Sequence, residues 1–525
     1  MEMPLNTNNK ILLIAFYCEK SIGVKNISNY LLKNGFDPVI CFIKTSPTNP
    51  TSITEKEIDL VFNLIYRNNF LFVGLSILSS YTLSEVHKIN DMIKKNFNIP
   101  IVWGGIYPTL CPEECAKYCD ILVRGEGEIA MLKLSETLQK GEDWKNLQNI
   151  CYYDENGHYI ENDLAPLIQD LDIIGYSSIP YKNIFFVEGN EIFNGNVESY
   201  KLFPREWDSY ELCIGRGCPF SCSYCSSSKL RNVYKGKGKY IRHRSVNSVI
   251  SEIKEAIQKN PDIKEVRFWD EVFPVRKDWV QDFSIQYKKE IGIRFVIWGH
   301  PLLIKKEELG MLVDAGLRRI TIGFQSGSPR IRNNVFNRFE TNEQIIEISR
   351  ILSSFPLLEV YYDLIICHPL ENVDELKETF DLCLKLTPPF GLQIHGLSFL
   401  PKTDIVKTMI EQGVYSKTEL ENIFNSSFEE NYKQWNGPRS DYYADNPEKK
   451  VWADLIFLSQ FYVLRKKVLN LAKNAINNAG KIDKLKNIIN SLSLEYQNFL
   501  KGGRNVKGIK LFIIKLKLFV LFYFK

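Results

Sequence analysis

Two stretches of the chain alternate short apolar runs with helical periodicity, and this alternation limits the fold more than any other feature. The apolar runs of the first stretch are Ile11–Phe16, Pro38–Ile43, Phe70–Ile77, Pro100–Gly104 and Asp120–Gly125. Segments with helical spacing lie between them, near residues 23–35, 54–68, 82–97 and 128–140. Buried strands separated by helices favour a parallel, doubly wound sheet of the Rossmann or flavodoxin type. We therefore predict an α/β domain over residues 8–150, with a ligand at the carboxyl ends of its strands.

The second stretch, residues 206–405, contains six further strand–helix repeats. Its apolar runs are Leu212–Arg216, Glu265–Trp269, Arg294–Trp298, Arg319–Phe324, Glu359–Ile366 and Leu392–Phe399. Helical spacing occurs near residues 246–259, 277–290, 305–315, 342–353 and 373–387. Six repeats are fewer than the eight of a complete (β/α) barrel, and in barrels the chemistry lies at the carboxyl ends of the strands.

The remaining segments carry weaker signals. Residues 151–205 have no sustained periodicity and are predicted to be a connecting segment, with a turn at Asp154-Glu155-Asn156-Gly157. Residues 406–525 are predicted to be a mostly helical C-terminal region. Its end, residues 507–525, is a basic amphipathic tail whose longest uncharged apolar run, 518–524, is far shorter than the about 20 residues that span a bilayer. The tail suits a membrane surface, or a helix docked on the protein's own core.

Three cysteines share one loop after the first strand of the second stretch: Cys218, Cys222 and Cys225, spaced Cys-x3-Cys-x2-Cys. Thiolates are the usual ligands of iron–sulfur clusters, and a [4Fe–4S] cluster usually takes four. A loop that offers three leaves one iron open to a small molecule. The alternative is a zinc site, but zinc would require a paired Cys or His at a matching spacing, and the nearest candidate, His243, has no such partner.

The residues around these cysteines extend the pattern. Arg216-Gly217 precedes Cys218, Pro219-Phe220 follows it, and Tyr224 stands directly before the third cysteine. This loop resembles the signature of the radical S-adenosylmethionine (SAM) enzymes. The resemblance implies a partial (β/α)6 barrel and a [4Fe–4S] cluster on Cys218, Cys222 and Cys225, which would serve as both metal ligands and catalytic residues. In that family the open iron chelates SAM, and one electron then yields a 5′-deoxyadenosyl radical.

The same resemblance suggests residues that contact SAM. Tyr224 is similar to the aromatic residue that lies against the adenine. Asp270 and Glu271 end the second strand, where a carboxylate can accept a hydrogen bond from the SAM ammonium or ribose. Gln325 and Ser326 end the fourth strand where the family reads Gly-Ile-Glu-Ser-Gly, so Gln325 keeps an acceptor oxygen but lacks the charge of the usual Glu.

The turn after the fifth strand departs further from the family. The family often reads Gly-x-Pro-Gly-Glu-Thr there, and only Pro369 and Glu371 match it. His368 and His395 stand at strand ends, where an imidazole can act as a general acid or base, the alternative being ordinary barrel-mouth histidines.

Small residues follow three strands of the first stretch, and glycines there let the backbone approach a bulky ligand. In this order, directly ahead of the barrel, they resemble the cobalamin-binding domain of the B12-dependent radical SAM proteins. The residues that the resemblance assigns to cobalamin are Gly74, Ser76, Gly104, Gly105, Tyr107, Gly125, Glu126 and Gly127.

One departure concerns the cobalt ligand. Many cobalamin domains carry Asp-x-His-x-x-Gly after the first strand, but residues 16–23 contain no histidine and the first histidine of the chain is His87. The resemblance therefore implies cobalamin without a histidine as lower ligand. A separate trio, Cys111, Cys115 and Cys119, would share one face of a helix; it could bind a cluster, but buried structural cysteines are the favoured interpretation.

Composition limits the partners. The net charge of +4 on 525 residues gives no indication of a nucleic-acid partner. The polar N-terminus is unlike a signal peptide, and the twelve cysteines are expected to be reduced thiols in the cytoplasm. We expect a small-molecule or lipid-like substrate, an external electron donor of the flavodoxin or ferredoxin type, and peripheral membrane contact if the tail binds lipid.

These features together predict a B12-dependent radical SAM enzyme that transfers a methyl group to an unactivated carbon or phosphorus centre. Two alternatives stay open. One is a non-methylating enzyme with the same cofactors that cyclises, contracts a ring or oxidises, because a fold does not fix a function. The other is a sensor that binds cobalamin or a cluster without turnover, against which the intact cysteine loop argues.

Overall fold

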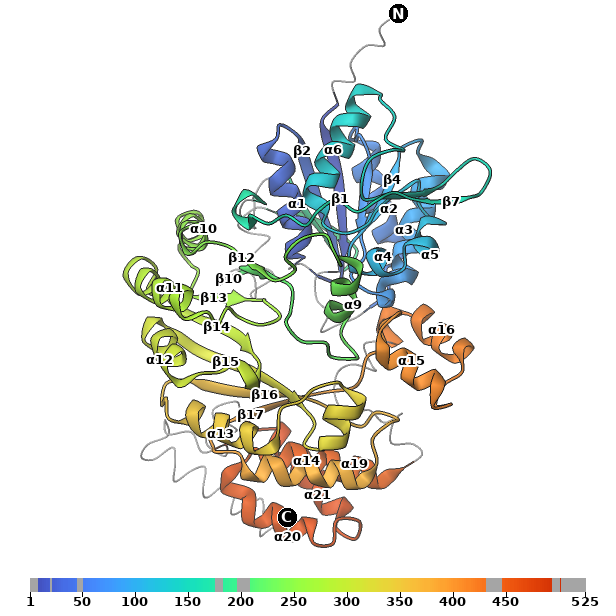
Figure 1. Cartoon of the computed structure of the whole chain (residues 1–525). Helices are drawn as coiled ribbons and strands as arrows, with labels where there is room; N and C mark the ends of the chain where they lie inside the picture. The colour runs from blue at the N-terminus through green and yellow to red at the C-terminus, as the bar shows by residue number, and fades with distance from the viewer. Residues whose placement is uncertain are drawn as a thin grey trace, which may run out of the picture. The chain divides into compact units, whose positions relative to one another are not determined.

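The structure, a computed structural model, describes residues 8–18, 21–44, 51–174, 183–195, 208–430, 446–492 and 501 of the chain. It consists of two compact units (Figure 1). Unit 1 comprises Met1–Ile297, Asp314–Gly316 and Ser398–Lys433. Unit 2 comprises Trp298–Val313, Leu317–Leu397 and Gln434–Lys525.

The first sheet of unit 1 has a core of parallel strands in the order β2-β1-β3-β4-β5. Their bounds are β1 Lys10–Phe16, β2 Asp37–Ile43, β3 Val73–Ser76, β4 Ile101–Gly104 and β5 Ile121–Val123. The strand order reverses between β1 and β3, and ligands bind at such a switch point in open α/β sheets. The predicted doubly wound parallel sheet is confirmed.

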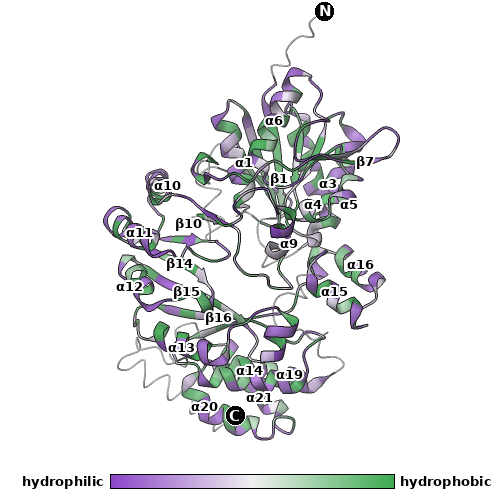
Figure 2. Ribbon diagram, viewed as in Figure 1, coloured by the Kyte–Doolittle hydropathy of each residue, from purple (hydrophilic) through white to green (hydrophobic). Residues whose placement is uncertain are grey.

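Helices cover both faces of this sheet (Figure 1). The helices are α1 Ile22–Lys33, α2 Glu55–Tyr66, α3 Leu83–Asn96, α4 Ile106–Leu110, α5 Pro112–Ala116 and α6 Gly127–Lys140. Leu13 of β1 faces α1 and α6 in one apolar core, whereas Leu12 faces α2 and α3 in the other. Figure 2 shows the strands as predominantly hydrophobic, as expected for a sheet that is buried on both faces.

The segment predicted as a connection is partly sheet, which corrects that prediction. Its strands are β6 Ile150–Tyr153, β7 Tyr159–Glu161, β8 Ile184–Glu188 and β9 Glu191–Asn194. The hairpin β6–β7 pairs antiparallel with β5, and β8 pairs parallel with β2, so the segment extends both edges of the sheet. The two strands of a hairpin lack the intervening helix that marks the other strands of this sheet in the sequence. The predicted turn is present, since the Asp154 carboxylate accepts from the Asn156 and His158 amides at 2.9 and 2.8 Å.

The barrel strands of unit 1 follow. Their elements are β10 Ser209–Leu212, β11 Gly215–Arg216, α9 Ser226–Val233, β12 Arg242–His243, α10 Val246–Lys259, β13 Glu265–Phe268, α11 Lys277–Glu290 and β14 Arg294–Gly299. β10 is parallel to β13, and β13 to β14. β11 and β12 form a separate antiparallel ribbon in which Arg216 stands opposite Arg242.

The strand predicted over residues 212–216 is divided, which corrects another prediction. β10 ends at Leu212, and the next backbone amides do not continue its ladder: Ile214 N–H and Gly215 N–H both donate to the Asp270 carboxylate, Ile214 at 3.0 Å. A buried side chain thus replaces a neighbouring strand as the partner of this backbone.

Unit 2 holds the remaining barrel strands, β15, β16 and β17, which are parallel and adjacent in that order. Its main elements are α12 Lys306–Ala315, β15 Leu317–Gln325, α13 Asn342–Ser353, β16 Glu359–Ile365, α14 Val373–Lys385, β17 Gly391–His395, α19 Pro447–Ser459, α20 Arg465–Ala472 and α21 Ala479–Asn490. Helix α19 packs against α14 and α21. All six predicted barrel strands are therefore present in the two units.

The described part of the C-terminal region is helical, as predicted, but belongs to both units. Helices α15 Asp404–Glu411 and α16 Lys417–Asn425 lie in unit 1. There the Phe428 ring stacks on Tyr17, with centroids 3.9 Å apart. Among the described residues, no helix is both long and apolar enough to cross a membrane. The amphipathic tail lies outside the described residues.

Close packing of β15 on α14 yields a stability prediction. A Cβ at Gly327 would lie 2.3 Å from the Thr379 Cα and 2.8 Å from the Glu378 carbonyl oxygen. Because backbone cannot move aside as a side chain can, Gly327→Ala should destabilise the protein by about 1–3 kcal/mol in chemical denaturation. Gly480→Ala is the control, since no atom lies within 4 Å of a Cβ there. Equal stability of Gly327→Ala and the wild type would contradict this packing.

Candidate active site

A cavity of about 480 Å³ lies within unit 1 at the β1/β3 switch point. It is lined by strand ends of the first sheet, by α1 and α6, and by the ribbon residues Gly215 and Arg216. Seven of the eight residues that the sequence assigned to cobalamin line it: Gly74, Ser76, Gly104, Gly105, Gly125, Glu126 and Gly127.

Two glycines of the cavity lining pack closely against neighbouring side chains. A Cβ on Gly74 would lie 2.9 Å from Leu13 Cδ2, and one on Gly127 would lie 2.8 Å from Ile27 Cδ1. The walls are otherwise largely apolar, with Val102 and Met131 among them. An apolar slot floored by glycine backbone accepts a flat ring system, so these residues fit the nucleotide end of a cobalamin.

Tyr107 is the exception among the predicted cobalamin residues. It is the second residue of the short helix α4, and its side chain packs against the apolar core on the α2 and α3 side of the sheet. Its backbone N–H donates to the Ile77 carbonyl at 3.2 Å. A contact between Tyr107 and cobalamin stays a prediction that the cavity lining does not support.

The cysteine loop runs from β11 to α9, and several backbone contacts fix its path. Cys225 is the residue before α9, and its N–H donates to the Cys222 carbonyl at 3.1 Å. The Arg231 guanidinium donates to the carbonyls of Cys218 and of Phe220, the latter at 2.9 Å. Gly217 has φ +90, and a Cβ there would lie 2.6 Å from the Tyr240 carbonyl oxygen, so only glycine fits at the start of the loop.

Burial disfavours the thiolate form of two thiols in the cysteine loop. Burial raises the pKa of Cys218 to about 11 and also raises that of Cys225, so the thiolate form is favoured only when a metal replaces the proton. Among the described residues, no three His, Cys, Asp or Glu side chains gather as ligands of one metal ion. That absence does not count against a [4Fe–4S] cluster, whose thiolates attach to different iron atoms.

The sequence also raised two other metal sites, a zinc site that includes His243 and a cluster on Cys111, Cys115 and Cys119. His243 lies in β12 opposite Gly215, on the antiparallel ribbon. Cys111, Cys115 and Cys119 are all buried in the core that faces α2 and α3. Their positions support the interpretation of this trio as structural cysteines.

The predicted acidic pair has two different roles in the structure. Both carboxylate oxygens of Asp270 accept backbone N–H groups at the root of the cysteine loop, and burial raises the pKa of Asp270 to about 7. Asp270 thereby positions the loop. Glu271 lines the cavity instead and accepts a hydrogen bond from Ser227, beside the loop, at 3.1 Å. Glu271 is thus the better placed of the two to contact SAM.

The other predicted SAM residues lie apart from this cavity lining. Tyr224 is half-buried within the loop. Gln325 ends β15 in unit 2 with φ +67, and its Oε1 is buried with no hydrogen-bond partner among the described residues. Ser326 is fully buried, and its Oγ lies 3.3 Å from Thr379 Oγ1. Backbone strain and an unpaired oxygen at Gln325 are features often found at ligand sites, and they leave its assignment to SAM a prediction.

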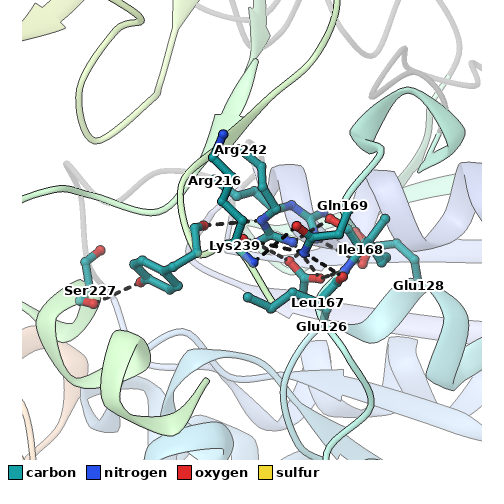
Figure 3. A network of polar contacts seen from close by, with 10 residues as sticks. Glu126, Glu128, Leu167, Ile168, Gln169, Arg216, Ser227, Lys239 and Arg242 are labelled. Carbon is teal, nitrogen blue, oxygen red and sulfur yellow. Dashed lines mark hydrogen bonds and ion pairs between the residues drawn. The ribbon is translucent and has the colours of Figure 1, made fainter. Parts of the chain in front are cut away.

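Sequence reasoning assigned Glu126 to cobalamin but missed the ion pairs that join the glycine turn to the cysteine loop. Arg216 and Arg242 both contact Glu126, at 3.0 and 2.9 Å, and Arg216 also contacts Glu128 (Figure 3). Burial opposes ionisation of Glu126, but the two guanidinium groups outweigh it and hold the pKa of Glu126 below its ordinary value. The sequence offered one signal, the Arg216-Gly217 pair directly before the first cluster cysteine.

Two family models match the chain. The radical SAM superfamily model matches residues 212–383, and the B12 binding domain model matches residues 10–135. The two matched ranges correspond to the barrel strands with the cysteine loop and to the first sheet with its glycine turns.

Two curated relatives carry different activities in their names. An uncharacterized methyltransferase of Pyrococcus horikoshii is 29% identical over 320 residues, covering 58% of this chain and 61% of the relative. The anaerobic magnesium-protoporphyrin IX monomethyl ester cyclase of Rubrivivax gelatinosus is 25% identical over 379 residues, covering 70% of this chain and 62% of the relative. The matches thus span about three fifths of each relative's length.

A solved structure shares the fold. The cobalamin-dependent SAM radical enzyme OxsB, with aqua-cobalamin bound, superposes with a TM-score of 0.61 at 15% identity. The match covers 98% of this chain and 73% of OxsB. The fold resemblance therefore extends through both matched domains and into the C-terminal region.

The cluster ligands can be tested directly. Cys222→Ala should lower the iron bound per chain after anaerobic reconstitution and reduce SAM cleavage to background, because a thiolate ligand is lost. Cys115→Ala, which removes an equally buried thiol from the N-terminal core, should keep both. SAM cleavage by Cys222→Ala with unchanged cluster content would show that the cluster is assigned to the wrong residues.

Glu371 lies in the turn after β16, where it matches the Glu of the family's Gly-x-Pro-Gly-Glu-Thr pattern. Its environment leads to a prediction about the pH dependence of stability. Its Oε2 accepts from Cys367 N–H at 2.6 Å, its Oε1 has no partner among the described residues, and burial raises its pKa to about 8. When the pKa of a carboxyl is higher in the folded state than in the unfolded state, the folded protein loses stability as the pH rises toward and through the folded-state pKa. Glu371→Gln should match the wild type near pH 5 and exceed it by on the order of a few kcal/mol near pH 8.5.

Denaturant unfolding at the two pH values measures this difference. The exposed Glu347→Gln on α13 is the matched control and should show no gain at the higher pH. An equal response of both variants to pH would place the ionised Glu371 in a polar environment, contrary to the structure.

The family models, the fold and the site agree with one another. The B12-binding match contains the strand ends and the start of α6 that line the cavity, and the radical SAM match contains all three cysteines of the loop. The chain therefore combines a B12-binding domain with a radical SAM domain, which is the domain arrangement of the cobalamin-dependent radical SAM protein family.

Proposed function

We propose that this enzyme transfers a methyl group to an unactivated carbon or phosphorus centre. The observation that carries the proposal is the shared cavity of unit 1. Its lining includes the glycine turns of the B12-binding domain, and also Gly217 and Glu271 next to the cysteine loop. Groups bound at these two places would therefore face one enclosed space, as direct transfer of a methyl group requires.

The cofactors would supply the difficult chemistry: the SAM-bound cluster gives a 5′-deoxyadenosyl radical that removes a substrate hydrogen, and methylcobalamin gives the methyl group. Cys218, Cys222 and Cys225 would hold the cluster. Glu271 would accept a hydrogen bond from the SAM ammonium or ribose while Ser227 orients its carboxylate. The apolar cavity walls would keep water from reactive species.

We further propose that cobalamin binds without a histidine below the cobalt. None of the described residues that line the cavity is a histidine. His87 lies on α3, and its ring packs 5.7 Å from Trp103, which is buried in the core on the opposite face of the sheet. Residues 19 and 20 of the loop after β1 lie outside the described residues.

In unit 2, Gln325 and Ser326 remain proposed SAM residues. The His395 ring lies 3.8 Å from the Asp363 carboxylate on the neighbouring strand, a pair suited to exchanging a proton with a substrate. We propose a small-molecule or lipid-like substrate, a flavodoxin- or ferredoxin-type electron donor, and a cytoplasmic location with membrane association through the tail.

A second candidate keeps the cofactors but transfers no methyl group. The cyclase name of the Rubrivivax relative supports it, as the methyltransferase name of the Pyrococcus relative supports the first. The two candidates differ in one product. Methyl transfer consumes a second SAM to restore the methyl group on cobalt and so releases S-adenosylhomocysteine.

The test is a two-product assay. The chain is purified without oxygen, reconstituted with iron, sulfide and cobalamin, and given SAM and a strong reductant. 5′-Deoxyadenosine and S-adenosylhomocysteine are then quantified together. We expect both products, with the second dependent on cobalamin, because residues of the glycine turns and residues next to the cysteine loop line one cavity.

The Cys222→Ala variant controls for background cleavage, and omission of cobalamin controls for the second product. Deoxyadenosine without cobalamin-dependent S-adenosylhomocysteine, once candidate substrates have been supplied, would favour the cyclase-type alternative. Neither product from protein with a full cluster would favour a sensor.

A further inference from the structure

Two glutamates and two arginines connect the B12-binding domain to the cysteine loop through ion pairs. Glu126 and Glu128 lie at the start of α6, and Arg216 and Arg242 lie on the ribbon β11–β12 (Figure 3). Arg242 and Glu128 are buried, at 5% and 2% exposure. These four residues are called the clamp below, and all of them belong to unit 1.

The two acids of the clamp offset the repulsion between the two arginines of the ribbon. Arg216 and Arg242 stand directly opposite each other, and like charges in that position are destabilising. Glu126 Oε1 accepts from both guanidinium groups, at 3.0 Å from Arg216 and 2.9 Å from Arg242. Glu128 accepts from Arg216 through both carboxylate oxygens, Oε2 at 3.3 Å. The ribbon can thus keep this geometry only with the two acids in place.

Further bonds fix the acids and the second arginine. The Ile168 N–H donates to Glu126 Oε2 at 2.9 Å, and Arg242 Nη1 donates to the Ile168 carbonyl at 2.6 Å. Buried charges with all these partners are costly to separate, so they favour one arrangement of the segments that carry them.

Each end of the clamp adjoins a cofactor site. Glu126 stands between Gly125 and Gly127 in the turn that lines the cavity. Arg216 is followed by Gly217, whose backbone is wedged against Tyr240, and then by the first cluster cysteine. A shift of the glycine turn would move the acids, and with them the arginine at the root of the cysteine loop.

We propose that Arg216 is a positioning residue through which occupation of the cobalamin cavity and assembly of the cluster favour each other. The proposal rests on the proposed function, in that it takes cobalamin and a [4Fe–4S] cluster as the two ligands. Coupling between two sites is reciprocal: if the cluster orders the loop and so strengthens cobalamin binding, cobalamin strengthens retention of the cluster by the same factor.

The experiment measures the dissociation constant of hydroxocobalamin for the full-length chain with and without its cluster, from the cobalamin absorbance spectrum. The ratio of the two constants is the coupling factor. We expect a factor of about fivefold or more in the wild type. In Arg216→Gln the factor should approach one, because the link to Glu126 and Glu128 is lost.

Two further variants separate positioning from mere stability. Glu128→Gln should also reduce the coupling factor, because it changes the acidic partner of Arg216. The double variant Arg216→Gln/Glu128→Gln should have the same coupling factor as Arg216→Gln alone. Arg216→Lys keeps the charge but loses the two-pronged contact, so its factor should be intermediate. Arg319→Gln, which breaks an Arg–Glu359 pair on β15 and β16 of unit 2, is the matched control and should keep the wild-type factor.

A purely structural role for Arg216 would weaken both dissociation constants in parallel and leave their ratio unchanged. That result, or a wild-type factor of one, would overturn the clamp while leaving the methyl-transfer proposal intact. If hydroxocobalamin bound neither form of the wild-type chain, the cobalamin assignment itself would fail, and the proposed function with it. If Arg216→Gln does not fold, Glu128→Gln and Arg216→Lys decide the question by the same measurement.

Discussion

A parallel sheet brings the carboxyl ends of its strands to one edge, and the cavity of unit 1 depends on that geometry. In the first sheet the strand order reverses between β1 and β3, so the connections on either side diverge and leave a cavity. Its lining includes Gly74, where a Cβ would meet the Leu13 side chain at 2.9 Å, so the packing there is close. The cavity therefore results from chain topology, and glycines form part of its lining.

Buried charge is used at this site to hold backbone in place. The Asp270 carboxylate accepts hydrogen bonds from two backbone amides that do not continue the ladder of β10. Glu126 accepts from two arginines that would otherwise repel each other. Both arrangements are expensive in an apolar interior unless every partner is present. Their location at the root of the cysteine loop fits a site in which a loop with little secondary structure of its own must present three thiols in a fixed arrangement.

Membership in the family does not decide the reaction. A methyltransferase and a cyclase are both among the relatives, and the fold is compatible with either. The candidate cofactor residues of this chain lie in unit 1, around the cavity and on the cysteine loop, and in unit 2 at Gln325 and Ser326. What distinguishes methyl transfer from cyclisation is the substrate and its orientation. His395, at a strand end of unit 2, is a candidate for that selection.

The sequence by itself determined the long periodic elements and the cysteine loop. Helices α10 and α11 have the bounds that periodicity predicts, 246–259 and 277–290, because amphipathic spacing is a local property. It did not reveal β6 to β9, because these strands form two hairpins without the intervening helices that mark the other strands of the sheet in the sequence. Nor did it reveal that Glu126 would meet Arg216 across 90 residues of chain, or that Asp270 would divide the first barrel strand. Only the tertiary structure decides such contacts, because a charged side chain finds its partner through the path of the folded chain and not through its neighbours in sequence.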